Sequence, residues 1–240
     1  IRYAATVQGN YQTAIEAAEQ TLALLPKHAA RNPRHLKQIA APWLVHKIFG
    51  QWPRVLEIKR PAEGSPYLSG MWAYTQGSAH IAQRAFSQAR EHLTQLEAFV
   101  EISRRDTGQA GATPNARILE LAALSLRGEL LAATGDLDGA IKAFEAGVAL
   151  EDRNNYTEPP DWPQPIRHYL GAALLKAARP ADAEAVYRRD LQWNHNNGWS
   201  LLGLQQALLA QGKIEAAKIV ETAFDTAWQY SNITLERSHL

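Results

Sequence analysis

The chain has 240 residues, of which 46% are hydrophobic and 20% are charged, and this composition is typical of a folded protein and excludes an intrinsically disordered one. Its 25 basic residues are almost balanced by 24 acidic ones, so the net charge of +1 gives no electrostatic basis for binding nucleic acid or a membrane surface. There are no cysteines, which excludes disulfides, thiolate metal ligands and a cysteine nucleophile.

The first part of the chain predicts three helical hairpins, over residues 1–30, 36–60 and 68–103. The first hairpin lacks the front of its leading helix, so we expect a chain that is truncated or processed at its N-terminus. The second hairpin is degenerate. The first residues show no basic-then-apolar signal, and a targeting region is expected to be missing, so a cytoplasmic and a periplasmic location both stay open.

Three further hairpins are predicted over residues 115–150, 164–193 and 198–230. Gly135 ends a helix, because glycine accepts the left-handed backbone of a C-cap, and Asp136 is placed to cap the following helix. Gly128 and Gly171 are small where two helix axes must approach closely. The pattern predicts an all-α fold whose core includes Leu124, Leu131, Ala140, Phe144, Leu170, Leu174, Ala183, Tyr187, Leu202 and Leu208.

The spacing within these hairpins resembles the tetratricopeptide repeat. One copy reads Leu124-x2-Arg127-Gly128-x2-Leu131-x8-Ala140-x3-Phe144, with Arg127 in place of the usual leucine. Another reads Arg167-x2-Leu170-Gly171-x2-Leu174-x8-Ala183-x3-Tyr187, with Arg167 in place of the usual aromatic residue. Residues 156–199 also look like the C-terminal part of a group of uncharacterised bacterial tetratricopeptide proteins. The resemblance implies a right-handed superhelical solenoid of five to six antiparallel helical hairpins, some of them degenerate, in a single array over residues 1–240.

The resemblance also implies where a partner would bind. In tetratricopeptide arrays the leading helices line a concave groove, on a stripe next to their Leu-Gly packing stripe. We therefore expect a non-catalytic scaffold that binds a protein or peptide, with no cofactor. Its mixed polar groove face would contain Tyr74, Ser78, Ser125, Glu129, Arg167, His168 and Gln206. An ordinary solvated helix face is the alternative for each of these residues.

The stretch YTEPPDWPQP, residues 156–165, predicts a stiff connection, because its four prolines prevent a helix and hold the backbone extended. We expect it to form the rim of the groove through Tyr156, Glu158, Asp161 and Trp162, with its two acids near Arg167 and His168. The alternative is a connector fixed by its aromatic side chains, which would fold back onto the helices.

An enzyme is the second hypothesis, with a hydrolytic or metal-dependent site formed by the acidic stretch and neighbouring histidines. The sequence contains no HxxH or HxxxH pair and no nucleophile or phosphate-binding motif, so no catalytic or metal-binding residue is assigned. The most apolar run, residues 118–134, is interrupted by Glu120, Arg127 and Glu129, and no membrane span is expected.

Overall fold

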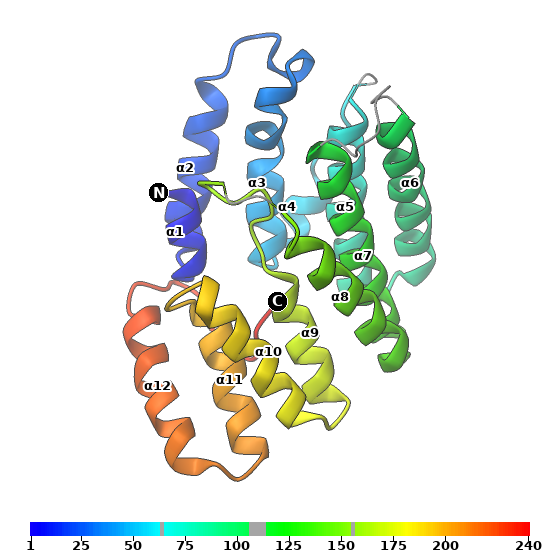
Figure 1. The fold of residues 1–240 in the computed structure, drawn as a ribbon. Coiled ribbons are helices and arrows are strands. Elements are labelled where there is room, and N and C mark those ends of the chain that lie inside the picture. Colours follow the sequence, from blue (N-terminus) through cyan, green and yellow to red (C-terminus); the bar gives the residue numbers. More distant parts are fainter. Residues whose placement is uncertain (63–64, 106–113, 155–156) are drawn as a thin grey trace.

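The computed structural model describes residues 1–62, 65–105, 114–154 and 157–240 (Figure 1). All regular secondary structure in these residues is helical, which confirms the predicted all-α class. Two short 3₁₀ helices, η1 (Ala29–Arg31) and η2 (Pro33–His35), precede α3. The twelve α-helices of the described residues are α1 (Arg2–Val7), α2 (Tyr11–Ala23), α3 (Leu36–Ile48), α4 (Trp52–Leu56), α5 (Pro66–Ala82), α6 (Phe86–Arg105), α7 (Pro114–Thr134), α8 (Leu137–Glu151), α9 (Ile166–Lys176), α10 (Pro180–Trp193), α11 (Gly198–Ala210) and α12 (Ile214–Trp228).

The helices pack in chain order, each against the next one. In addition, α3, α5, α7, α9 and α11 pack against one another in a continuous row. Because this row has neighbours on more than one side, polar residues in it are more deeply buried than on an ordinary surface helix. None of the helices in the described ranges is long and apolar enough to cross a membrane.

The predicted helix end at residue 135 is confirmed. Helix α7 stops at Thr134, and Gly135 has a φ of +97°, in the left-handed region that glycine adopts without strain. The Asp136 side chain then accepts a hydrogen bond of 2.8 Å from the Gly139 amide and caps α8. The turn between α7 and α8 is therefore encoded by two adjacent residues.

Helices approach closely around Tyr187 of α10. A Cβ atom added to Gly171 on α9 would lie 2.3 Å from this tyrosine ring, and one added to Gly203 on α11 would lie 2.2 Å from it. Real Cβ atoms do not approach so closely, so both positions need glycine. The ring of Tyr187 thus passes between α9 and α11.

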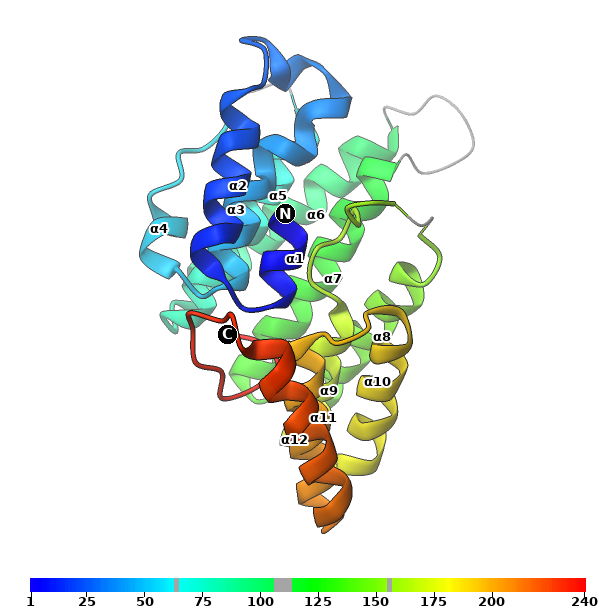
Figure 2. The same cartoon turned by 90° about the vertical axis from the view of Figure 1, so that its left-hand side faces the viewer.

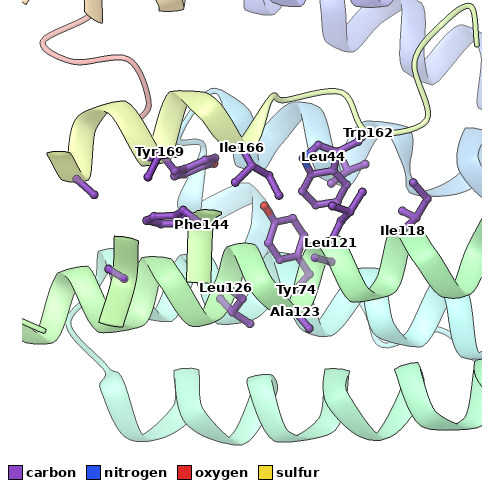
Figure 3. Close-up of a cluster of buried hydrophobic side chains, with 14 of the residues drawn as sticks. Leu44, Tyr74, Ile118, Leu121, Ala123, Leu126, Phe144, Trp162, Ile166 and Tyr169 are labelled. Carbon is purple, nitrogen blue, oxygen red and sulfur yellow. The ribbon is translucent and has the colours of Figure 1, made fainter. Parts of the chain in front are cut away.

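The side chains form two hydrophobic clusters. The larger one joins α3 and α5–α12, and Figure 3 shows its central part. Eight of the ten predicted core residues are buried, whereas Leu124 and Leu131 are partly exposed. The smaller cluster joins α1, α2 and α3 to Trp199 of α11.

The two ends of the helix series touch each other. The Trp199 indole on α11 donates a hydrogen bond of 3.0 Å to the carbonyl oxygen of Thr6 on α1. The Tyr3 hydroxyl donates one of 3.1 Å to Asn194, which follows α10. Figures 1 and 2 show α1 next to the adjoining ends of α11 and α12. The first helix therefore contacts α11 and the turn after α10.

Residues 229–240, which we call the C-terminal segment, have no helix or strand and turn back from the end of α12 (Figure 2). Residues 236–239 contact α9, α10 and α11. Their first part is attached to the turn between α1 and α2. Asn10 donates a hydrogen bond of 3.1 Å to the carbonyl of Tyr230, and the Tyr11 amide donates one of 2.9 Å to the Asn232 side chain. The segment therefore bridges the two ends of the helix series.

Candidate functional site

A buried lysine lies at the centre of the helix row. Lys47 is near the end of α3, and its side chain is 2% exposed. Its Nζ atom donates hydrogen bonds to the Tyr169 hydroxyl on α9 and, at 3.2 Å, to Glu129 on α7. A buried cation is costly unless it is paired and hydrogen-bonded. The two bonds meet that requirement and join three helices at one atom.

Two further polar residues complete this group, which we call the Lys47 cluster: Lys47, Tyr74, Ser125, Glu129 and Tyr169. Ser125 donates a hydrogen bond of 3.1 Å to Glu129 and is itself 3.2 Å from the Tyr74 hydroxyl. The Tyr74 ring, from α5, has its centroid 4.8 Å from Nζ of Lys47, within the range of a cation–π contact. Four helices thus supply one connected polar network inside an apolar core.

Burial dominates the electrostatics of the cluster. It lowers the pKa of Lys47, while the charge and hydrogen bond of Glu129 act in the opposite direction. It raises the pKa of Tyr74 and Tyr169 well above the usual value, and the negative charge of Glu129 adds to the effect. The two hydroxyls therefore stay protonated at neutral pH.

The stretch that precedes α9 closes one side of the cluster. Trp162 is buried, with its ring centroid 5.5 Å from that of Tyr74, and Figure 3 shows it beside Leu44 and Tyr74. The Gln164 side chain accepts a hydrogen bond of 2.5 Å from Tyr169. Trp162 therefore folds back onto the helices, as expected for an aromatic side chain that fixes a connector.

The acids of the same stretch lie elsewhere. Asp161 forms an ion pair with Lys37 of α3. Together with Glu158 it lines a cleft of about 680 Å³, whose other walls come from α1, α2, α3 and Tyr67 of α5. Figure 1 shows residues 157–165 crossing toward these helices. The expected position of Tyr156 lies outside the described residues.

The acids in contact with Arg167 and His168 are Asp152 and Asp190. Arg167 makes two hydrogen bonds, of 2.8 and 2.7 Å, to the carboxylate of Asp152 at the end of α8. His168 faces the buried Asp190 of α10 at 3.4 Å. Both side chains are buried in the helix packing, and the Arg167 guanidinium is paired there with the Asp152 carboxylate.

The predicted groove residues are mostly inaccessible. Five of the seven are buried: Tyr74, Ser78, Ser125, Arg167 and His168. Glu129 and Gln206 are partly exposed. The inner face of the leading helices is not open to solvent at these five positions, because neighbouring helices and the two non-helical segments cover it. The structure nevertheless brings Tyr74, Ser125, Glu129 and Trp162 together around Lys47.

Lys47 itself was not predicted from the sequence. The signal was present: Lys47 stands in the run PWLVHKIF, where Leu44, Val45 and Ile48 are apolar. A lysine in a run that is buried on several faces is expected to need a carboxylate partner. The partner, Glu129, comes from a helix 82 residues away, so only the three-dimensional structure identifies it.

The C-terminal segment covers a second side of the cluster. The His239 ring stacks on Tyr169, with centroids 4.8 Å apart. The Ser238 hydroxyl is fully buried, donates a hydrogen bond of 2.8 Å to the carbonyl of His168, and is 2.7 Å from the Tyr187 hydroxyl. Gln206 of α11 donates a hydrogen bond of 2.6 Å to the carbonyl of Glu236. An irregular peptide is therefore bound here by side chains of three helices.

Metal binding has no geometric basis in the described parts of the chain, where no three histidine, aspartate or glutamate side chains are grouped so as to hold an ion. Comparison of the chain with protein-family models and with curated proteins finds no match. The arrangement of side chains is thus the basis for a functional proposal.

Proposed function

We propose that the chain is a non-catalytic scaffold that binds an extended protein or peptide segment on the inner side of its leading helices, and that it forms a right-handed tetratricopeptide-type solenoid. The single observation that carries this proposal is the way residues 236–240 lie on α9, α10 and α11. A segment without regular structure is held there by a main-chain hydrogen bond, a hydroxyl pair and a ring stack.

The chemistry of these three contacts suits peptide recognition. The Gln206 amide bonds a carbonyl oxygen, which every peptide offers, whereas the Tyr187 hydroxyl and the Tyr169 ring contact side chains. Main-chain bonds give affinity without sequence preference, and side-chain contacts add selectivity. The Lys47 cluster supports the surface from beneath by holding Tyr169 in one position.

The alternative of a hydrolytic or metal-dependent enzyme has less support. It needs the acids of residues 156–165 and nearby histidines at one place, with a base and a bound water or nucleophile. Asp161 is paired with Lys37, and His168 faces Asp190 instead. Asp161 and His168 therefore belong to separate contacts.

The proposal is tested by screening the purified chain against an immobilised library of extended peptides. We expect selected peptides to bind with a single stoichiometry and to crosslink to α9 and α11. Gln206→Ala should weaken all of them, because it removes the contact to a main-chain carbonyl. Arg188→Ala, on the exposed face of α10, is the matched control and should have no effect. Failure to bind any peptide, or turnover of generic hydrolase substrates that Gln206→Ala leaves intact, would contradict the proposal.

A further inference from the structure

The C-terminal segment is attached at two places that differ in kind. Its first part, residues 230–232, is bonded to the turn at Gly9–Tyr11 through both main-chain and side-chain groups. Its last part, residues 236–240, lies on the surface of α9, α10 and α11 that we propose as the peptide-binding site. The hydrogen bonds of residues 230–232 use none of the groups that bond Glu236 and Ser238, so they would keep the segment tethered if its last part left the surface.

The surface beneath residues 236–240 is formed by groups that do not depend on the segment for their position. The Tyr187 ring is fixed between Gly171 and Gly203. Tyr169 is fixed by Lys47, by Gln164 and by the Phe144 ring at 5.7 Å (Figure 3). Departure of the segment would therefore leave a preformed surface, and a preformed surface binds a replacement with little loss of conformational entropy.

The same surface restricts what can replace the segment. The Tyr187 side chain is fully buried, and Ser238 is the hydrogen-bond partner of its hydroxyl within the described chain. A partner without a hydroxyl at this place would leave two polar groups of the surface, the Tyr187 hydroxyl and the His168 carbonyl, without the bonds they now make.

The next position requires a flat and uncharged ring. His239 lies on the Tyr169 ring, where burial and then the charges of Arg237 and Lys47 disfavour a further positive charge. A lysine or arginine at this position would add a further positive charge to that environment, whereas a neutral histidine, tyrosine or phenylalanine would keep the stacking contact.

We infer that residues 236–240 stand in for the partner's peptide, and that the partner must displace them with an extended segment carrying a serine or threonine followed directly by an uncharged aromatic ring. This inference rests on the proposed peptide-binding function and adds the chemistry of the partner and its regulation by the chain itself. A carbonyl two residues before the hydroxyl would accept the bond from Gln206, as Glu236 now does.

The tether sets the expected size of the effect. A short flexible tether gives an attached segment an effective concentration on the order of 1 mM. If the free segment binds with a dissociation constant of about 0.1 mM, the docked form exceeds the undocked form about tenfold, and a competing peptide loses affinity by the same factor.

The experiment uses the full chain and a fluorescent peptide with the sequence of residues 232–240, NITLERSHL. The releasing variant is Ser238→Asp with His239→Ala, which places a carboxylate against the His168 carbonyl and removes the ring. Contacts of residues 230–232 and of Tyr187 with the glycines are unchanged, so circular dichroism should report the same helix content. We expect this variant to bind the peptide about tenfold more tightly than the unchanged chain.

Two controls make the test specific. Adding Tyr187→Phe to the releasing variant keeps the ring but removes its hydroxyl, and should weaken peptide binding several-fold. A peptide with alanine at the position of Ser238 should bind the releasing variant equally weakly. If the releasing variant folds poorly, hydrogen exchange is measured on the unchanged chain instead. In that chain the amides of residues 235–240 should exchange faster when excess peptide is added.

Four outcomes would overturn the inference. The releasing variant could bind the peptide no better than the unchanged chain, or Tyr187→Phe could leave binding unaltered. A releasing variant that binds other library peptides with the affinity of the unchanged chain would leave the scaffold function standing and reject self-occupation. Concentration-dependent dimers of the unchanged chain that dissociate on adding the peptide would assign the surface to a second copy instead of a partner.

Discussion

The hydroxyl oxygens of Tyr187 and Ser238 are 2.7 Å apart. Tyr187 belongs to α10, whereas Ser238 belongs to the C-terminal segment, which lies against α9 and α11. The tyrosine reaches the serine because Gly171 and Gly203 leave room for its ring between the two helices. Glycine where two helices approach closely is explained by helix packing. Here the two glycines also allow the Tyr187 hydroxyl to pass between α9 and α11 and to reach Ser238.

Tyr187→Phe should lower the free energy of unfolding by about 1 kcal/mol, the usual contribution of one hydrogen bond. The ring and its packing remain, and Ser238 keeps its bond to the His168 carbonyl. Urea denaturation followed by circular dichroism would measure the change.

Gly171→Ala is the companion to that variant and should cost more, about 1–3 kcal/mol, because its new methyl group overlaps the tyrosine ring. Combining Gly171→Ala with Tyr187→Ala should remove the overlap. A Gly171→Ala variant as stable as the unchanged chain would show that the ring does not pass between the helices.

The Lys47 cluster predicts strong coupling between its two charges. Glu129→Gln should destabilise the chain by about 3–5 kcal/mol, because it leaves a buried cation without its carboxylate. The double variant of Glu129→Gln with Lys47→Met should lose at least about 1 kcal/mol less stability than the sum of the losses of the two single variants. The reason is that the double variant has no unpaired buried charge. Equilibrium unfolding of the four chains gives this cycle directly.

Lys37→Met is the matched control for the cluster. The Lys37–Asp161 pair also joins α3 to another element, but the lysine side chain is 40% exposed. Its loss should cost less than about 1 kcal/mol. Similar costs for Lys37→Met and Lys47→Met would mean that burial does not set the strength of these pairs.

The docking of the C-terminal segment should weaken in acid. Burial, followed by the charges of Arg237 and Lys47, lowers the pKa of His239 to about 3, against an ordinary value of 6.5. The undocked or unfolded chain therefore takes up the proton first, so stability is fully present above pH 6.5 and falls below it, by at most about 1.4 kcal/mol for each pH unit.

His239→Phe isolates this contribution, because phenylalanine keeps a flat ring that does not titrate. Thermal unfolding between pH 4 and pH 7 should show a smaller acid loss for the variant than for the unchanged chain. Parallel pH profiles for the two chains would exclude His239 as the titrating group.

Glu151 should produce the opposite trend. Burial, assisted by the charges of Asp190 and Asp152, raises the pKa of Glu151 to about 8, although its carboxylate accepts a hydrogen bond of 3.0 Å from the Ile166 amide. The folded chain therefore keeps a proton that the unfolded chain loses near pH 4.5. Its contribution to stability is present below pH 4.5 and declines as the pH rises to about 8.

Glu151→Gln keeps the acceptor for the Ile166 amide and does not titrate. The difference in melting temperature between this variant and the unchanged chain should grow in favour of the variant from pH 5 to pH 8. A constant difference over that range would contradict a raised pKa.

Local features of the fold follow from the sequence, because they depend on neighbouring residues. The turn at Gly135 and Asp136 was predicted because glycine can end one helix and aspartate can cap the next. The burial of Phe144 and Tyr187 was predicted from the 3.6-residue period of apolar residues. Trp162 folds back onto the helices, which was the alternative to its expected place at the groove rim.

The site required information that periodicity does not contain. Lys47 and Glu129 are 82 residues apart and lie on different helices. A hydrophobic stripe shows which face of a helix is buried, but it does not show which helix packs against that face. Tyr74 and Ser125 were predicted to lie on an exposed groove face. The sequence shows no sign that irregular segments cover that face. Residues 229–240 lack any period, so their path could not be derived from the pattern.

The contact between the first and last helices has a consequence for how the chain unfolds. In an open repeat array each unit interacts with its neighbours alone, and the ends fray independently. Here Trp199 bonds to Thr6, and residues 230–232 bond to the turn before α2, so loosening either end removes contacts from the other. Amide protons in α2 and α12 should therefore share one opening free energy in native-state hydrogen exchange, and the chain should melt as a closed cooperative unit.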